Sequence, residues 1–111
     1  MDVVTSEPIV VLMTAADEPE ASRIAEMLVA KRLAACVQIL PGMQSIYGWQ
    51  GEVQREREVL LLVKATRANF AELEREVRAI HRYETPEIIA LPVVAGSEPY
   101  LKWLISSCEG S

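Results

Sequence analysis

The amino-acid sequence predicts an α+β fold with the element order β-α-β-β-α-β and one further helix at its end. Three observations lead to this prediction. Two short, β-branched apolar runs at 9–13 and 59–63 are typical of strands covered on both faces. Two longer segments repeat apolar residues at the spacing of a helix and begin with capping residues. A glycine-containing turn at 49–52 joins two extended segments into a hairpin.

The first strand, at 9–13, is followed by a helix start. Asp17 is placed to cap the helix, Pro19 fits its first turn, and Glu20 stands at the capping-box position. The helix is expected to run to about Arg32, because basic residues there complement the negative end of the helix dipole. Its apolar stripe consists of Ala21, Ile24, Ala25, Leu28 and Val29.

A long, kinked hairpin is expected next. The second strand covers 34–40, Pro41-Gly42 interrupts it, and the extended pattern resumes at 43–49. The return strand passes through the charged segment 55–58 and ends in the apolar run at 59–63. The charged segment is expected to project into solvent or to meet a partner.

The second half of the chain repeats the pattern of helix and strand. Thr66 is expected to cap a helix over 67–81, which carries Phe70, Leu73, Val77 and Ile80 on its inner stripe, with Glu74 and Arg78 as an i,i+4 pair. Pro86 requires the helix to end before it, and 87–91 forms the fourth strand. A short helix begins at 96–99, with Tyr100, Leu101, Leu104 and Ile105 as its apolar side.

With right-handed crossovers, this order gives a ferredoxin-like sheet whose first and third strands are central. Pro41 and Pro92 then fall on the edge strands, where proline is tolerated. A long, apolar edge strand needs a cover, and the segment 45–49 would leave aromatic rings in water. We therefore expect a closed homo-oligomer.

Length and composition predict a single globular domain over 1–111, with short tails at 1–7 and 109–111. Half of the residues are apolar and 24% are charged, which argues against disorder, and no apolar run is long enough for a membrane span. A net charge of −5 with mixed signs argues against a nucleic-acid partner. With no leader-like start and no CxxC pair between Cys36 and Cys108, we expect a cytoplasmic protein.

Candidate functional residues gather where the second helix passes into the fourth strand. His81, Tyr83, Glu84 and Glu87 lie within seven positions. A histidine and a carboxylate can hold Cu(II), Ni(II) or Zn(II), but the spacing matches no zinc signature, and a histidine at a helix end also caps carbonyls. Cys36 has three possible roles: a small apolar residue of the strand, a soft metal ligand, or a nucleophile with His81 as its base.

Other polar and aromatic residues admit two interpretations as well. Lys64, at the end of the third strand, is either solvated or paired with an anion or with Glu87. Tyr47, Trp49, Tyr100 and Trp103 suit core or interface anchors better than ligand stackers. The sequence contains no P-loop, no GxGxxG and no nucleophile elbow.

Several segments together resemble the CutA divalent-cation tolerance family in order and spacing. They are 34–39, 45–51, 58–64, 81–89 and 100–103, and the match spans about 9–105. The resemblance implies a ferredoxin-like homotrimer, similar in architecture to the PII signalling proteins. It also implies tolerance of divalent metals, binding of copper(II) or another divalent cation, and no catalysis.

The resemblance also implies which residues form the site. His81, Glu84 and Cys36 are the expected metal ligands, and Trp49, Lys64, Tyr83 and Glu87 are expected in a cleft between subunits. The sequence departs from the family pattern at Gln38, Gly48, Gln50 and Arg82. Arg82 places a cation beside His81, which disfavours a protonated imidazole and weakens cation binding. Two alternatives remain: a PII-like sensor that binds an anion or nucleotide with Lys64 and Arg82, and an enzyme that uses Cys36 with His81.

Overall fold

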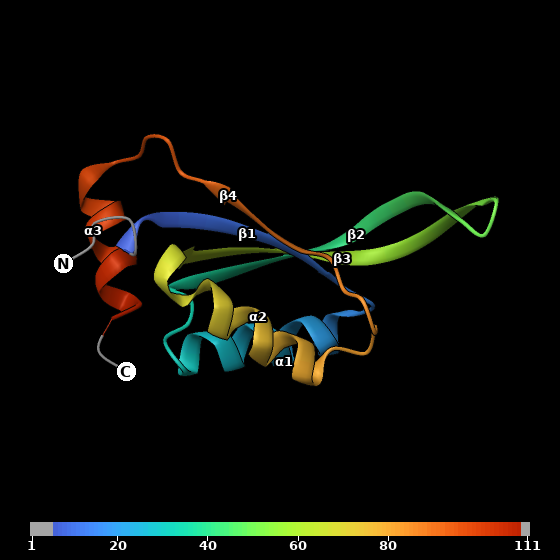
Figure 1. Ribbon diagram of the computed structural model, residues 1–111, viewed down its shortest axis with the longest axis horizontal. Coiled ribbons are helices and arrows are strands. Elements are labelled where there is room, and N and C mark those ends of the chain that lie inside the picture. The colour runs from blue at the N-terminus through green and yellow to red at the C-terminus, as the bar shows by residue number, and fades with distance from the viewer. Residues whose placement is uncertain (1–5, 110–111) are drawn as a thin grey trace.

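The computed structural model describes residues 6–109 and contains one four-stranded antiparallel sheet in the order β2-β3-β1-β4 (Figure 1). The elements are β1 (Pro8–Ala15), α1 (Glu18–Ala30), β2 (Cys36–Trp49), β3 (Glu52–Thr66), the 3-10 turn η2 (Arg67–Asn69), α2 (Phe70–Ile80), β4 (Ile88–Pro92) and α3 (Glu98–Ser107). The ferredoxin-like prediction is confirmed, with β1 and β3 central and β2 and β4 at the edges. Of the expected tails, 1–5 and 110–111 lie outside the described residues.

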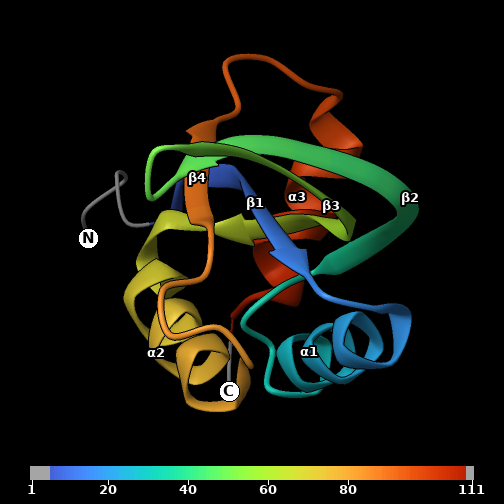
Figure 2. The ribbon, with the colours of Figure 1, turned by 90° about the vertical axis from the view of Figure 1, so that its right-hand side faces the viewer.

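Helices α1 and α2 lie side by side over one face of the sheet, whereas α3 packs at the end farthest from the hairpin turn (Figures 1 and 2). Alternation along the central strands places every second side chain under the two helices. The resulting core includes Ile9, Val11, Met13, Ala15, Val59, Leu61, Val63 and Ala65 from the sheet and Ile24, Leu28, Leu73 and Val77 from the helices. No helix among the described residues is long and apolar enough to cross a bilayer.

Helix α1 begins as predicted and ends slightly earlier than predicted. Asp17 Oδ1 accepts the backbone N–H of Glu20 at 3.0 Å, and Glu20 Oε1 accepts the N–H of Ala16 at 2.9 Å. The helix ends at Ala30 because Arg32 adopts a left-handed conformation with φ of 59°. A residue other than glycine in that position hides the usual signal of a helix end.

Helix α2 departs from the prediction at its start. The 3-10 turn η2 occupies the first three expected helical residues, and the side chain of Thr66 makes no capping hydrogen bond. The predicted pair is present, with Arg78 Nη1 3.8 Å from Glu74 Oε2. His81 has extended backbone dihedrals and ends the helix.

The β2–β3 hairpin extends well beyond the helices and makes the molecule 48 Å long but only 26 Å and 22 Å in the other two directions (Figure 1). Leu40 pairs with Leu60 and Met43 with Glu58, so β2 carries one extra residue at the Pro41-Gly42 kink. Because of this bulge, two sets of β2 side chains lie on the same face of the sheet. They are the even-numbered side chains before Pro41 and the odd-numbered side chains after Gly42. That face, opposite α1 and α2, is called the open face.

The open face and both sheet edges expose large apolar side chains. Leu40 is 57% exposed on β2, and Ile89 and Leu91 are 50% and 47% exposed on β4. Strand register places Val10, Leu12, Leu60 and Leu62 on this face beside them. The fold therefore leaves uncovered an apolar surface that the sequence predicts for an interface.

Candidate functional site

His81 holds together the turn between α2 and β4, which is called the corner. Its ring Nε2 lies 2.7 Å from the carbonyl oxygen of Thr14, and its Nδ1 lies 3.0 Å from the backbone nitrogen of Tyr83. The carbonyl can only accept, so Nε2 carries the proton and Nδ1 accepts from Tyr83. The side chain is fully buried. In one chain, both ring nitrogens are therefore engaged in holding the backbone.

Glu20 and Arg82 join the start of α1 to the same corner. Glu20 is 1% exposed, and its Oε2 accepts the backbone N–H of Arg82 at 2.8 Å. Burial alone would raise the pKa of Glu20, but the N–H donors of Ala16 and Arg82 outweigh it and hold the pKa below its ordinary value. The Arg82 guanidinium bonds to Asp17 Oδ2 at 2.5 Å. The Arg82 side chain thus pairs with Asp17, the N-cap of α1, and its Nε lies 3.9 Å from Glu20 Oε2, whereas its effect on His81 stays a prediction.

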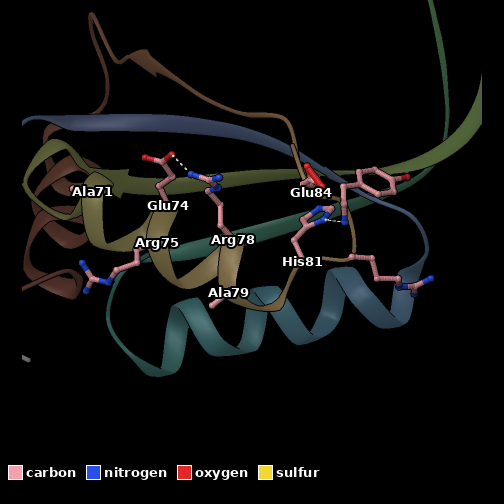
Figure 3. A pocket seen from close by; sticks show the side chains of 9 residues that line it. Ala71, Glu74, Arg75, Arg78, Ala79, His81 and Glu84 are labelled. Atoms are coloured by element: carbon pink, nitrogen blue, oxygen red, sulfur yellow. Dashed lines mark hydrogen bonds and ion pairs between the residues drawn. The ribbon is translucent and has the colours of Figure 1, made fainter. Parts of the chain in front are cut away.

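A pocket of about 650 Å³, called the helix pocket, lies along α2 and ends at the corner (Figure 3). Its lining residues are Ala71, Glu74, Arg75, Arg78, Ala79, His81, Arg82, Tyr83 and Glu84. His81 and Glu84 lie at one end and Arg75 at the other (Figure 3). Two of the three expected metal ligands therefore share one pocket, whereas Cys36 does not line it.

Cys36 lies at a different position along the strands of the sheet from His81. It pairs with Lys64, whereas Thr14, the partner of the His81 ring, pairs with Leu60. Four positions along β3 correspond to about 13 Å, so Cys36 and His81 are too far apart for a nucleophile and its base. Within residues 6–109, no three His, Cys, Asp or Glu side chains gather in a way that could hold a metal ion. Lys64 Nζ donates to Gln38 Oε1 at 2.5 Å rather than to Glu87.

A second cavity, of about 510 Å³, lies between the hairpin and the corner and is called the hairpin cavity. Its lining residues are Thr14, Tyr47, Trp49, Gln54, Glu56, Glu58, Tyr83, Thr85 and Glu87. The structure thus brings together three of the four residues expected in a cleft, namely Trp49, Tyr83 and Glu87. The fourth, Lys64, lies elsewhere on β3.

Hydrogen bonds from neutral hydroxyl groups hold the glutamates of the hairpin cavity. Glu58 accepts from Ser45 Oγ at 2.5 Å and from the Tyr83 hydroxyl at 3.2 Å, and Glu56 accepts from the Tyr47 hydroxyl at 2.7 Å. Burial, together with the negative charge of Glu58, raises the pKa of Tyr83 to about 12. The bond to Glu56 raises the pKa of Tyr47. Both phenols are therefore protonated donors at neutral pH.

Strand alternation sorts the charges of the hairpin by face. Glu56 and Glu58 lie on the open face, and Arg55 and Arg57 point to the opposite side of the sheet. Because of the bulge in β2, three of its side chains pair with β3 residues on the open face rather than with the arginines. They are Ser45, Tyr47 and Trp49. Gly48 pairs with Val53 on the arginine face, so its lack of a ring does not affect the cavity.

Sequence reasoning missed Tyr47, Glu56 and Glu58 as cavity residues. The signal was present in the alternation of arginine and glutamate over 55–58. It could not be used, because the pairing of β2 with this segment depends on the register across the Pro41-Gly42 bulge.

Comparisons with known proteins agree on one family. A sequence profile described as CutA1 divalent ion tolerance protein matches residues 9–107. A divalent-cation tolerance protein CutA from Thermus thermophilus is 54% identical over 95 residues, which cover 86% of this chain and 92% of that protein. A solved structure of the divalent cation tolerance protein from Thermus thermophilus matches with a TM-score of 0.86 at 52% identity, covering 87% of this chain and 94% of that chain. The crystal structure of CutA1 from Oryza sativa matches with a TM-score of 0.91 at 40% identity, covering 97% and 99%.

Proposed function

Because the chain belongs to the CutA1 divalent ion tolerance family, we propose that it acts as a homotrimer that binds copper(II) or a related divalent cation and catalyses no reaction. The proposed compartment is the cytoplasm. Support for this compartment comes from Cys36 and Cys108, which are both free, as is usual for proteins of reducing compartments.

The uncovered sheet edges support a closed assembly. Trp49 and Ile46 of β2 are 62% and 57% exposed, and β4 exposes Ile89 and Leu91 at the opposite edge. A closed ring of copies would cover both edges and the apolar open face together. The trimer is the ring size that the family resemblance implies.

Native mass spectrometry tests the assembly. At micromolar concentration, the expected mass is three times the 12.3 kDa of one chain. Ile89→Lys is expected to dissociate the assembly, because it places a charge in the proposed interface. Val94→Lys is the matched control, because Val94 is 93% exposed in the loop after β4. A stable wild-type monomer would contradict the proposal.

The observation that carries cation binding is a set of unpaired carboxylates around the corner. Glu56, Glu58 and Glu87 line the hairpin cavity, and Glu84 lines the adjoining helix pocket. None of the four makes an ion pair with another described residue. Uncompensated negative charge around a cavity attracts cations.

The proposed ligands are His81 and Glu84, with Cys36 contributed by a neighbouring copy. Cys36 of the same chain is too remote, so the site would be completed only in the assembly. His81 would have to release the backbone N–H of Tyr83 to offer Nδ1 to a metal. The fully buried ring also requires the corner to open slightly.

Calorimetric titration with Cu(II) tests this site. His81→Ala, Glu84→Gln and Cys36→Ser are each expected to weaken binding by about tenfold or more. Glu84 is exposed, so its variant tests the site without disturbing the buried network. Glu98→Gln, on α3, is the matched control. Unchanged binding in a variant would remove that residue from the site.

A second candidate function is a PII-like sensor of a small anion or nucleotide. The arginine side chains of the helix pocket favour it, since Arg75, Arg78 and Arg82 all line that pocket. Lys64, the other expected anion ligand, does not. A rise in melting temperature with ATP, and none with Cu(II), would favour this function over metal binding.

A further inference from the structure

We propose that Tyr83 is a latch, a positioning residue that keeps the corner closed over the His81 ring and joins this closure to the hairpin through Glu58. The inference deepens the proposed function, because it concerns the regulation of the His81 site, and it rests on that function for the identity of the ligand. The latch itself is a property of the chain without any ligand, so it can be tested separately.

Tyr83 is held at both of its ends. Its backbone N–H donates to His81 Nδ1 at 3.0 Å, and its hydroxyl donates to Glu58 Oε2 at 3.2 Å. Between these two bonds, its ring lies against the imidazole of His81, with the ring centroids 5.0 Å apart. One residue therefore connects the end of α2 with strand β3.

The hairpin end of the latch is fixed in place. Glu58 lies in β3 opposite Met43, and its other carboxylate oxygen accepts a hydrogen bond from Ser45 Oγ at 2.5 Å. The carboxylate therefore cannot follow a moving tyrosine without losing its bond to β2. Because burial and the charge of Glu58 raise the pKa of Tyr83 to about 12, the hydroxyl stays a donor at neutral pH.

The corner end of the latch is the part that can move. The corner belongs to neither a helix nor a strand, and the N–H of Arg82 just before Tyr83 is held by the buried Glu20 at 2.8 Å. A ligand that takes the lone pair of His81 Nδ1 must displace the N–H of Tyr83.

Displacement of this N–H acts on the hairpin through the tyrosine side chain. The N–H group and the side chain of Tyr83 are both attached to its Cα, so a turn of the backbone displaces the ring as well. Because Glu58 holds the hydroxyl, this turn also breaks the bond between them. The two bonds of Tyr83 are therefore expected to open together, and the hairpin resists exposure of Nδ1.

Hydrogen exchange at the amide of position 83, followed by NMR on the full, assembled protein without metal, tests the latch. Tyr83→Phe and Glu58→Ala are each expected to speed this exchange by about twofold to tenfold, because each removes the same hydrogen bond. The double variant should exchange no faster than the faster single variant.

The controls change a second pair of phenol and glutamate on the hairpin. Tyr47→Phe and Glu56→Ala disrupt the bond of 2.7 Å between these two side chains and leave the bonds of Tyr83 in place. Exchange at position 83 is expected to stay at the wild-type rate in both. A wild-type rate in Glu58→Ala would overturn the proposal. Equal acceleration in the controls would show general loosening of the hairpin and would also overturn it.

Calorimetric titration with Cu(II) tests the regulatory role of the latch. Tyr83→Phe is expected to bind Cu(II) about twofold to tenfold more tightly than the wild type, because the closed corner no longer has to be released from Glu58. Tyr47→Phe should bind as the wild type does. Equal or weaker binding by Tyr83→Phe would overturn the regulatory role. If the wild type binds no Cu(II), the proposed metal function fails, and the exchange rates alone decide whether the latch exists.

Discussion

Along α2 and at the corner, charged side chains meet partners of opposite sign within the chain, as Arg78 does with Glu74 and Arg82 with Asp17. Along the outer hairpin, the glutamates and arginines of β3 are kept on opposite faces, and among the described residues none of them forms an ion pair. In the first region these charges are paired within the chain, and Glu84 at the corner stays without an ion pair among the described residues. The second presents unmatched charge and exposed rings, so it is where a ligand or another copy has something to bind.

The largest expected effect compares two parts of β3, the part beneath the helices and the part in the outer hairpin. Leu61 is 0% exposed beneath the helices, and Leu61→Ala should lower the free energy of unfolding by about 2–5 kcal/mol through lost packing and a cavity. Val53 is 80% exposed on the hairpin, and Val53→Ala should change it by less than about 0.5 kcal/mol. Urea denaturation of both variants measures this difference. Similar losses would mean that the hairpin is as tightly packed as the core.

A smaller effect is expected at Glu20, where the corner meets α1. Glu20→Gln should lower the free energy of unfolding at pH 7 by about 1–3 kcal/mol, because it weakens acceptance from buried N–H groups. The pKa of Glu20 lies below its ordinary 4.5 in the folded chain, so the unfolded chain binds the proton first. The stabilisation is therefore complete above pH 4.5 and is lost as the pH falls toward the folded pKa.

Thermal unfolding measured from pH 7 down through pH 4.5 checks this sign. The wild type should lose stability below pH 4.5 more steeply than Glu20→Gln. Glu26→Gln, on the exposed side of the same helix, should keep the wild-type slope. A slope equal in all three proteins would exclude Glu20 as a source of the acid dependence.

The smallest effect should appear at the bond that joins the two regions. Tyr83→Phe and Glu58→Gln each disrupt the contact of 3.2 Å between corner and hairpin. A double-mutant cycle on the free energy of unfolding should give a coupling of about 0.5–1.5 kcal/mol. Tyr100→Phe combined with Glu58→Gln is the control pair and should be additive. Additivity in both pairs would show that the hairpin and the corner are energetically independent.

Much of the fold could be predicted from local patterns. The apolar runs in β1 and β3 identify the central strands, and the capping residues of α1 form the predicted contacts. The end of α1 was harder to predict, because Arg32 adopts the left-handed conformation that glycine usually adopts after a helix. These errors concern boundaries and do not affect the order of the strands.

The candidate site was less predictable, because its contacts join residues far apart in the sequence. Arg82 meets Asp17 across 65 positions, and Tyr83 meets Glu58 across 25. His81 was identified as a candidate ligand from its type and position, yet its buried ring bonds to Thr14 across 67 positions. No local pattern specifies such pairs. They follow from the register of the sheet and from the path of the chain at the corner.

The single extra residue in β2 is absorbed locally by the bulge, which limits what its loss would change. If Gly42 were deleted, Pro41 alone would lie opposite Val59, and the pairs Leu40–Leu60 and Met43–Glu58 would remain. Tyr47 and Trp49 would then keep the face of the glutamates in a regular ladder. Relatives can therefore differ in length by this one residue and still keep the aromatic and acidic residues together.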